Sequence, residues 1–386
     1  MPESTAHYFD LSLAEQAELL HGLAPVLGRR AEILEKDIWL CQVLGVLFAL
    51  PIRKPMAFKG GTSLSKVYQA IERFSEDIDV TIDYRSLVAD VPDLASLSNT
   101  QRKKLSDALK VALVKHVTEE LVPALRQALA QALPAHEVTI EVSDDAEKLW
   151  LYYPSAVENT DAYLRPSVLL EFGGRNATLP QDTMTIVPDV AAHVPVLAFP
   201  TAQVAVLSPM RTFWEKATLI HVECHRPDLR AGAERLSRHW YDLARLADHE
   251  VGRKALADTE LLSDVLRIKE TFYRSGFSHY ELCQTGGLRL ISRCRVAQCV
   301  AAGLPGHAGR PDVLRRDLGL RLHRRTPDHV GERDQSPRMS RGSRPIDRCS
   351  LDVLGSRWTV LPPMKQNRAI IKVFADHPSG ESDWET

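Results

Sequence analysis

The feature that most constrains the fold is a pair of glycines between an apolar strand and an amphipathic helix. Residues 56–58 predict a short strand, Gly60-Gly61 form the junction, and residues 62–71 predict the helix. Two glycines let the backbone turn tightly there and approach a ligand closely. Free N–H groups at the start of the helix suit a phosphate. The junction therefore predicts a phosphate site, although an ordinary turn would use the same residues.

The polar residues around this junction can complete such a site. The hydroxyls of Thr62 and Ser63 can donate hydrogen bonds to phosphate oxygens, and Lys59 and Arg73 flank the junction with positive charge. Solvated side chains would explain the two flanking cations equally well. We take the glycines, the hydroxyls and the cations together as the candidate nucleotide-binding residues.

An acidic strand follows the helix and carries two closely spaced carboxylates. Asp77 and Asp79 lie at the start of the alternating run at residues 78–84, and residues two apart in a strand point to the same face. Two carboxylates this close repel each other, and a divalent cation removes the conflict. Mg²⁺, or Mn²⁺ in its place, suits a site beside a triphosphate. The pattern predicts nucleotidyl or phosphoryl transfer from an NTP, and its alternative is an acidic face on an exposed strand.

A third carboxylate would complete the metal site or act as a base. Glu171 is the best candidate, because it lies near the end of the apolar run Val168–Phe172 on a predicted strand. An edge-strand acid that faces solvent is an equally good interpretation.

The composition is that of a soluble protein without disulfides. Hydrophobic residues make up 44% and charged residues 25% of the 386 residues, which excludes wholesale disorder. No apolar run is long enough to span a bilayer, and the polar N-terminus does not resemble a secretory signal. Six cysteines without a CxxC pair fit reduced thiols. We expect a cytoplasmic protein with no membrane contact.

The order of the predicted elements is helices, then a strand-rich centre, then helices. This order predicts an α+β core followed by a helical lobe. We divide the chain accordingly. Residues 1–200 form a catalytic domain with its leading helices, residues 201–290 a helical C-terminal lobe, and residues 291–386 an irregular tail.

The tail differs from the rest of the chain in composition. Between Arg293 and Arg348 there are thirteen arginines, no lysine and six acidic residues, and hydrophobic periodicity fades. One interpretation is a disordered basic arm that binds nucleic acid. The interpretation we favour is a segment that is not a selected folded sequence, such as a gene end read in a shifted frame. The remainder of the chain is net acidic and offers no obvious positive track for RNA.

Four motifs in order give the chain a family resemblance. They are Gly60-Gly61-Thr62-Ser63, Ser75-Glu76-Asp77-Ile78-Asp79, Thr212-Phe213-Trp214-Glu215-Lys216 and Arg238-His239-Trp240-Tyr241-Asp242-Leu243. Together they resemble the AbiEii/AbiGii nucleotidyltransferase toxins, a branch of the polymerase-β-like superfamily, over about residues 30–290. The resemblance implies a polymerase-β-like core, in which a small mixed sheet is flanked by helices. It also implies a toxin of a toxin–antitoxin, abortive-infection system that limits phage spread.

The resemblance also implies an activity. Such a toxin transfers a nucleotide from an NTP to an acceptor, which in relatives is the 3′ end of tRNA, and a separately encoded antitoxin restrains it. The implied roles are phosphate binding by Gly61 and Ser63, metal binding by Asp77 and Asp79, and essential functions of Lys216 and Asp242.

Periodicity alone leaves the last two residues open. Lys216 lies beside the apolar stripe of its helix, so its ammonium can reach a cleft or snorkel to the surface. Asp242 lies off the stripe of the next helix, four residues after Arg238, which favours an exposed ion pair. A carboxylate there can also orient Lys216 or the attacking hydroxyl.

Three other functions fit parts of the sequence. A small-molecule, antibiotic-type nucleotidyltransferase would use the same metal site with another acceptor pocket. The chain could also be a non-catalytic nucleotide binder. In the family the helical lobe should continue past Gly287, and here the arginine-rich tail replaces that part of the lobe. A zinc-stabilised binding protein would use His221, Cys224 and His225, which have ligand spacing on one helix face but no second ligand cluster.

Overall fold

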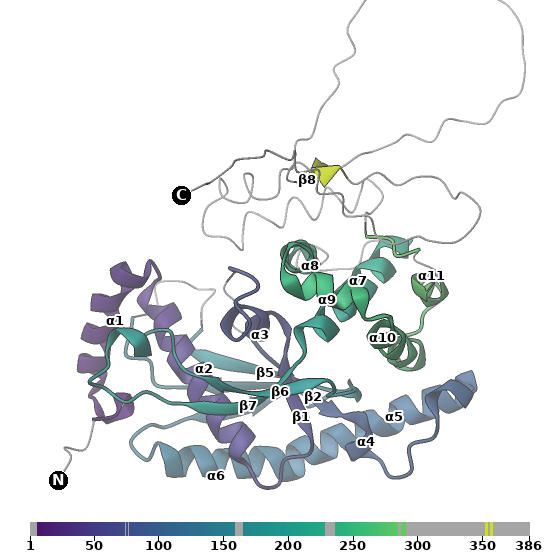
Figure 1. Ribbon diagram of the computed structural model, residues 1–386. Helices are drawn as coiled ribbons and strands as arrows, with labels where there is room; N and C mark the ends of the chain where they lie inside the picture. The colour runs from purple at the N-terminus through teal and green to yellow at the C-terminus, as the bar shows by residue number, and fades with distance from the viewer. Residues whose placement is uncertain are drawn as a thin grey trace, which may run out of the picture.

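The computed structural model describes residues 6–73, 75, 77–158, 165–227, 236–284, 287–290, 352–353 and 356–357. The predicted irregular tail, residues 291–386, lies outside the described residues except for two short strands, β8 (Asp352–Val353) and β9 (Ser356–Arg357). In the other described residues, a mixed sheet carries helices on both of its faces (Figure 1).

The sheet has seven strands in the order β3-β4-β5-β2-β1-β7-β6. They are β1 (Met56–Lys59), β2 (Asp77–Asp83), β3 (Thr139–Val142), β4 (Lys148–Tyr152), β5 (Ser167–Asn176), β6 (Gln181–Ile186) and β7 (Ala202–Leu207). β1 runs antiparallel to β2 and parallel to β7, while β2 and β5 are parallel. The predicted α+β class is confirmed, and the acidic strand β2 lies at the centre of the sheet.

Helices connect the strands and form a lobe after β7. In chain order they are α1 (Leu13–Leu27), α2 (Ala31–Ala49), α3 (Gly60–Lys66), α4 (Tyr84–Leu87), α5 (Asn99–Lys115), α6 (Val122–Ala132), α7 (Pro209–His225), α8 (Ser237–Asp248), α9 (Glu250–Ala257), α10 (Thr259–Phe272) and α11 (Tyr280–Gln284). Side-chain caps set the predicted starts of α1 and α7. Ser12 accepts from the backbone N–H of Glu15, and Ser208 accepts from that of Met210.

Alternation along the strands separates two faces of the sheet. On β5 every second residue from Val168 to Gly174 is buried. Apolar residues of this face pack with α2, α5 and α6 in the main core. The opposite face lies below α3 and the lobe of α7–α11 in Figure 1, and the lobe has its own core, where Leu64 of α3 packs with Phe213 and Trp214 of α7. The acidic residues of β2 therefore lie between two cores.

Some predicted elements differ from the structure. Helical periodicity predicts a single helix over residues 254–273, which is wrong, because Asp258 ends α9 and caps the start of α10. The amphipathic pattern of residues 101–133 predicts a long helix broken near Pro123, and the structure has no break at Pro123 itself. Instead, α5 and α6 are joined by a π-helical segment at His116–Leu121. Strand β6 was not predicted, since its residues lack clear alternation and its pairing with β7 holds it in place.

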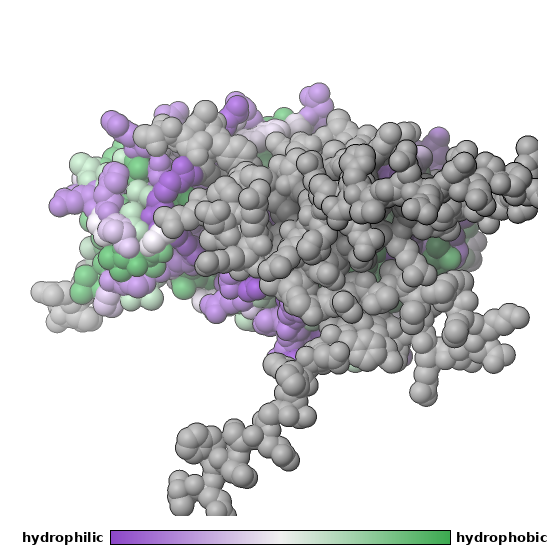
Figure 2. Space-filling view, turned by 90° about the horizontal axis from the view of Figure 1, so that it is seen from above, coloured by the Kyte–Doolittle hydropathy of each residue, from purple (hydrophilic) through white to green (hydrophobic). Residues whose placement is uncertain are grey.

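None of the described helices is long and apolar enough to cross a membrane. Seen from above, the coloured surface around α1 mixes hydrophilic and hydrophobic residues (Figure 2). Leu13 and Val26 of α1 are among the exposed apolar side chains. Scattered apolar side chains of this kind are ordinary on a protein surface and need no partner to explain them.

Candidate active site

The glycine junction is a tight corner between β1 and α3. Gly60 has a positive φ of 84°, a backbone conformation that favours glycine. A Cβ atom at Gly60 would overlap Oδ2 of Asp79, and one at Gly61 would overlap Nη2 of Arg73. The absence of side chains therefore lets a carboxylate and a guanidinium approach the corner, and the structure places the corner directly against the acidic strand.

The two hydroxyls of the corner are buried and bonded to the backbone. Oγ1 of Thr62 donates to the carbonyl of Asp77 at 2.5 Å, and Oγ of Ser63 donates to the carbonyl of Gly60 at 3.0 Å. Thr62 thereby ties α3 to the start of β2. Both side chains hold the shape of the corner, and their contact with phosphate stays a prediction.

Asp77 and Asp79 project from one face of β2, where four strands place charged residues in a row. Asp79 lies opposite Lys59 of β1 and Glu171 of β5, and Glu171 lies opposite Lys148 of β4. Residues directly opposite each other share a face of the sheet. Nζ of Lys148 lies 2.8 Å from Oε1 of Glu171. The row therefore has two adjacent carboxylates at its centre and a lysine at each end.

Like charges gather around Asp79. Burial raises the pKa of this carboxyl, the negative charges of Glu171 and Asp77 raise it further, and the pKa reaches about 6. Lys59 and Lys216 oppose this shift but do not cancel it. An added cation between the carboxylates would relieve the repulsion.

The side chain of Asp242 is fully buried, at 0% exposure, and holds two cations. Arg73 donates to it through Nε at 2.7 Å and Nη2 at 2.8 Å, and Nζ of Lys216 lies 2.8 Å from Oδ2. Burial raises the pKa of Asp242, but Lys216 and Arg73 outweigh burial and lower the pKa to about 2. The exposed ion pair favoured by the spacing to Arg238 is wrong, because α8 turns Asp242 inward. Nη1 of Arg238 instead lies 3.8 Å from Oδ2 of Asp77.

Lys216 is buried as well, with 7% of its surface exposed, so the snorkelling alternative is wrong. Its Nζ lies 3.4 Å from Nδ1 of His239. Burial and the charge of Lys216 hold the pKa of His239 well below its usual range, so this imidazole is neutral and can accept from the ammonium. Lys216 therefore points inward from α7, between Asp242 and Asp79.

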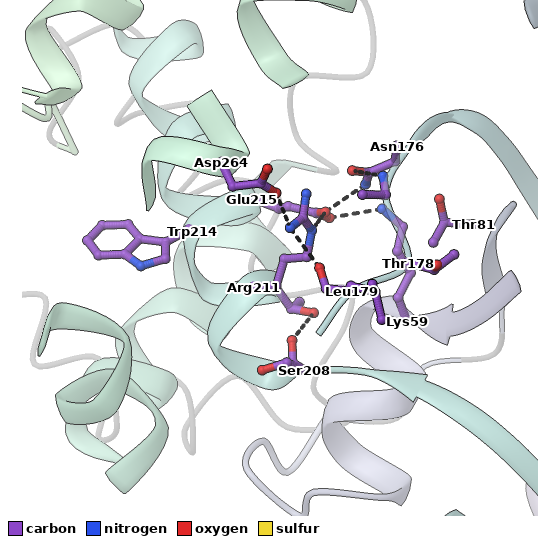
Figure 3. Close-up of polar contacts among 12 residues, drawn as sticks. Lys59, Thr81, Asn176, Thr178, Leu179, Ser208, Arg211, Trp214, Glu215 and Asp264 are labelled. Atoms are coloured by element: carbon purple, nitrogen blue, oxygen red, sulfur yellow. Dashed lines mark hydrogen bonds and ion pairs between the residues drawn. The ribbon is translucent and has the colours of Figure 1, made fainter. Parts of the chain in front are cut away.

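A second buried carboxylate, Glu215, precedes Lys216 on α7 and contacts a different set of residues (Figure 3). Nζ of Lys59 lies 2.9 Å from Oε2 of Glu215, and Nδ2 of Asn176 donates to Oε1 at 2.6 Å. Burial raises the pKa of Glu215, but Lys59 and neighbouring cations lower it to about 2. Lys59, predicted as a phosphate contact, is therefore engaged by an ion pair that the sequence analysis missed.

Arg211 belongs to the same cluster and was also missed. Its Nη1 lies 2.7 Å from Oδ2 of Asp264 and donates to the carbonyl of Leu179 at 2.8 Å, while Nε lies 3.6 Å from Oε1 of Glu215 (Figure 3). These contacts join α7 to α10 and to the connection between β5 and β6. The i,i+4 spacing of Arg211 and Glu215 could have indicated this ion pair, but pairs with that spacing usually lie exposed on helix surfaces.

The histidines proposed for zinc are used differently. Nδ1 of His221 accepts from the backbone N–H of Arg289 at 2.8 Å, so its Nε2 donates to the carbonyl of His279 at 3.1 Å. Nδ1 of His225 lies 2.9 Å from the carbonyl of His221. Within the described ranges, no group of three or more His, Cys, Asp or Glu side chains is arranged to hold a metal ion. The zinc ligand set is therefore not assembled.

The carboxylates of β2 suit a different kind of metal site. Mg²⁺ is usually held by one or two protein carboxylates together with phosphates of the substrate. Asp77 and Asp79 provide such a pair, and burial together with the neighbouring acids raises the pKa of Asp79. The donor set fits a divalent metal that arrives with a nucleotide. Glu171 is bonded to Lys148, and its part as a third ligand stays a prediction.

Comparison with known families agrees with the arrangement of these motifs. The sequence profile described as "Nucleotidyl transferase AbiEii toxin, Type IV TA system" matches residues 43–296. The chain belongs to the AbiEii family. It is a nucleotidyltransferase toxin of a type IV toxin–antitoxin system, an enzyme whose family uses NTP substrates and is paired with an antitoxin. The resemblance inferred from four motifs is confirmed.

Among solved structures, the AbiEii chain is similar to MenT4, a nucleotidyltransferase toxin from Mycobacterium tuberculosis H37Rv. The two sequences are 17% identical, the match covers 78% of this chain and 91% of that chain, and the TM-score is 0.36. No curated protein matches the sequence.

Proposed function

We propose that this AbiEii toxin transfers a nucleotide from an NTP to the 3′ end of a tRNA by metal-assisted in-line displacement. The observation that supports this most is the packing of Asp79, beside Asp77, against the Gly60 corner. Phosphates that lie at this corner would be within reach of both carboxylates. An acceptor hydroxyl on the open side of Asp79 could then attack the α-phosphate, with pyrophosphate as the leaving group.

Asp77 and Asp79 would hold Mg²⁺ or Mn²⁺ together with the triphosphate. When bound, the metal neutralises charge on the phosphates and on the leaving group. The two carboxylates are held in place by the strand pairing of β2 with β1 and β5, so little ordering is needed when the substrate binds. Glu171 lies beside Asp79, and we propose it as the third carboxylate, either for the metal or for the proton of the attacking hydroxyl.

Lys216 and Arg73 are the proposed triphosphate contacts. Asp242 binds both cations while it is itself fully buried, so it orients them from beneath the corner. Arg73 lies against Gly61, and Lys216 lies close enough to Asp79 to lower its pKa. Cations fixed in this way stabilise negative charge that develops on the transferring phosphate. Asp242 is in this view a positioning residue.

The test is expression in bacteria followed by gel analysis of tRNA 3′ ends. We expect the wild type to arrest growth and lengthen these ends, and the double variant Asp77→Ala, Asp79→Ala to do neither. Asp182→Ala, which changes an exposed acid on β6, is the matched control and should be as toxic as the wild type. Unaltered toxicity of the double variant would refute the proposed site.

A second assay separates the alternatives in vitro. Purified protein is incubated with radiolabelled NTPs, with total tRNA in one tube and aminoglycosides in another. Label on tRNA supports the proposal, and label on an aminoglycoside instead would show a small-molecule enzyme. Bound NTP without transfer to either would show a non-catalytic nucleotide binder.

A further inference from the structure

One strip of the sheet lies open beyond Glu171. Along β5, Glu171, Gly173 and Arg175 are partly exposed on the same face, while the residues between them are buried. A Cβ atom added at Gly173 would meet no described atom within 4 Å other than its chain neighbours, whereas one at Gly174 would overlap Leu87 on the packed face. The structure therefore leaves room above Gly173, between Glu171 and Arg175, which lie about 13 Å apart along the strand at the usual rise per residue.

Positive charge borders this strip. Lys59 lies opposite Asp79 and near the side chain of Tyr273. Tyr273 is 40% exposed, and the guanidinium of Arg175 and the ammonium of Lys269 lie 5.2 Å and 4.8 Å from the centroid of its ring. Three cations and a partly exposed aromatic residue therefore lead away from the catalytic carboxylates. Two of these cations have acidic partners, because Lys59 is paired with Glu215 and Nη2 of Arg175 lies 3.5 Å from Oε1 of Glu147.

Arg175 also lines a groove of about 1000 Å³ between α5 and the turn after α10. The other basic residues that line it are Arg102, Lys103, Lys110 and Arg274. The acidic residues that line it are Asp107, Glu270 and Glu281. Asp107 lies 3.7 Å from Lys110, and Glu281 lies 3.2 Å from His279, so two of the three acids already have a basic neighbour. The groove keeps an excess of positive charge.

We infer that the strip and the groove together bind the phosphodiester backbone of the acceptor RNA; we call them the acceptor track. It comprises Gly173, Arg175 and Tyr273 on the strip and Lys103 and Arg274 in the groove. The inference rests on the proposed function, because the track begins where the 3′ hydroxyl would meet Asp79. Cations attract the phosphates of a nucleic acid, and bases stack on exposed aromatic rings.

The shape of the acceptor track favours a polymer over a small acceptor. A small molecule would need a pocket at Asp79 but neither the clear strip nor the groove beyond it. The track also supplies a local positive surface in a chain whose remainder outside the arginine-rich segment is net acidic. A short acidic peptide would be attracted by the groove but has no reason to extend along the strip to the catalytic carboxylates.

Charge reversal in the groove tests the inference. The double variant Lys103→Glu, Arg274→Glu changes two exposed groove residues, and Lys104→Glu, Arg253→Glu is a matched control with exposed residues outside the groove. We expect the groove variant to bind fluorescently labelled total bacterial tRNA at least 10-fold more weakly than the control in an anisotropy titration. Its plot of log affinity against log salt should be shallower by about 1.4 to 1.8, because two phosphate contacts are lost.

The same variants separate this inference from the proposed function. ATP binding and the melting temperature should match the wild type in both. If the wild type labels tRNA and the groove variant binds and labels it as well as the control does, the acceptor track is wrong and the proposed function stands. If the wild type neither binds nor labels tRNA, both are wrong. If both double variants lose tRNA binding equally, the attraction is general and the track is wrong.

A steric block on the strip provides a second, independent test. Gly173→Leu fills the space above β5 without an expected clash, because a Cβ there has room. We expect nucleotide transfer to tRNA to fall at least 10-fold while ATP affinity and melting temperature stay at wild-type values. Normal transfer by this variant would show that the acceptor does not pass over the strip.

Discussion

Two kinds of buried carboxylate meet in this molecule, and their surroundings differ in charge. Asp79 has Glu171 and Asp77 as neighbours, and burial together with these acids raises its pKa to about 6. Asp242 and Glu215 are buried too, but nearby cations outweigh burial and lower the pKa of each to about 2. Balanced charge of the second kind stabilises the fold. A carboxylate such as Asp79, whose pKa is raised by neighbouring acids, is typical of a binding site, here one for a cation with its nucleotide.

The largest expected effect is on nucleotide transfer and follows from changing Asp79, the carboxylate with acidic neighbours. We expect Asp79→Asn to lower nucleotide transfer at least 1000-fold, or about 4 kcal/mol in activation free energy, because the metal loses a ligand. The same change should leave the free energy of unfolding unchanged or raise it, since a repelling charge is removed. Transfer assays and urea denaturation measure the two effects. A marked loss of stability would show that Asp79 is structural.

Asp242, the carboxylate paired with cations, should behave in the opposite way, because its substitution should lower stability. We expect Asp242→Ala to reduce the free energy of unfolding by about 3–5 kcal/mol, because Arg73 and Lys216 are left buried without their carboxylate. Urea denaturation of the purified protein measures this. Asp248→Ala is the control on the same helix, where an exposed acid should change the stability by no more than about 0.5 kcal/mol. Equal effects of the two substitutions would contradict the comparison.

The unbalanced site was the part that could be predicted from sequence. A strand, two glycines, a helix and a second strand lie close together along the chain, so local rules placed Gly60 near Asp79. The alternation of β2 put Asp77 and Asp79 on one face. Tertiary packing was not needed for either inference, because both depend on neighbouring segments.

The balanced clusters could not be predicted, because they depend on contacts between distant segments. Asp242 appears exposed by helical periodicity and is buried only because α8 packs toward Arg73 and Lys216. Glu215 meets Lys59 across 156 residues of chain. Strand β6 was missed for the same reason, since it is held by pairing with β7. The proposed division of the chain near residues 200 and 290 stays a prediction.

The smallest expected effect is a change of stability with pH that comes from the buried imidazole of His221, whose two hydrogen bonds require its neutral form. Burial lowers the pKa of His221 to about 4, while an unfolded histidine titrates near 6.5, so between these values the unfolded chain takes up a proton that the folded chain refuses. Stability should therefore fall by up to about 2 kcal/mol as the pH drops from 6.5 to 5. Between pH 7.5 and pH 5, His221→Gln should lose less stability than the wild type or the exposed control His21→Gln, as measured by urea denaturation.

Added zinc should not raise the melting temperature at pH 7.5, because Nδ1 of His221 already accepts from the backbone N–H of Arg289 and its Nε2 donates to the carbonyl of His279. A rise in melting temperature with added zinc would support the zinc-site alternative and show that the histidines of the lobe bind a metal.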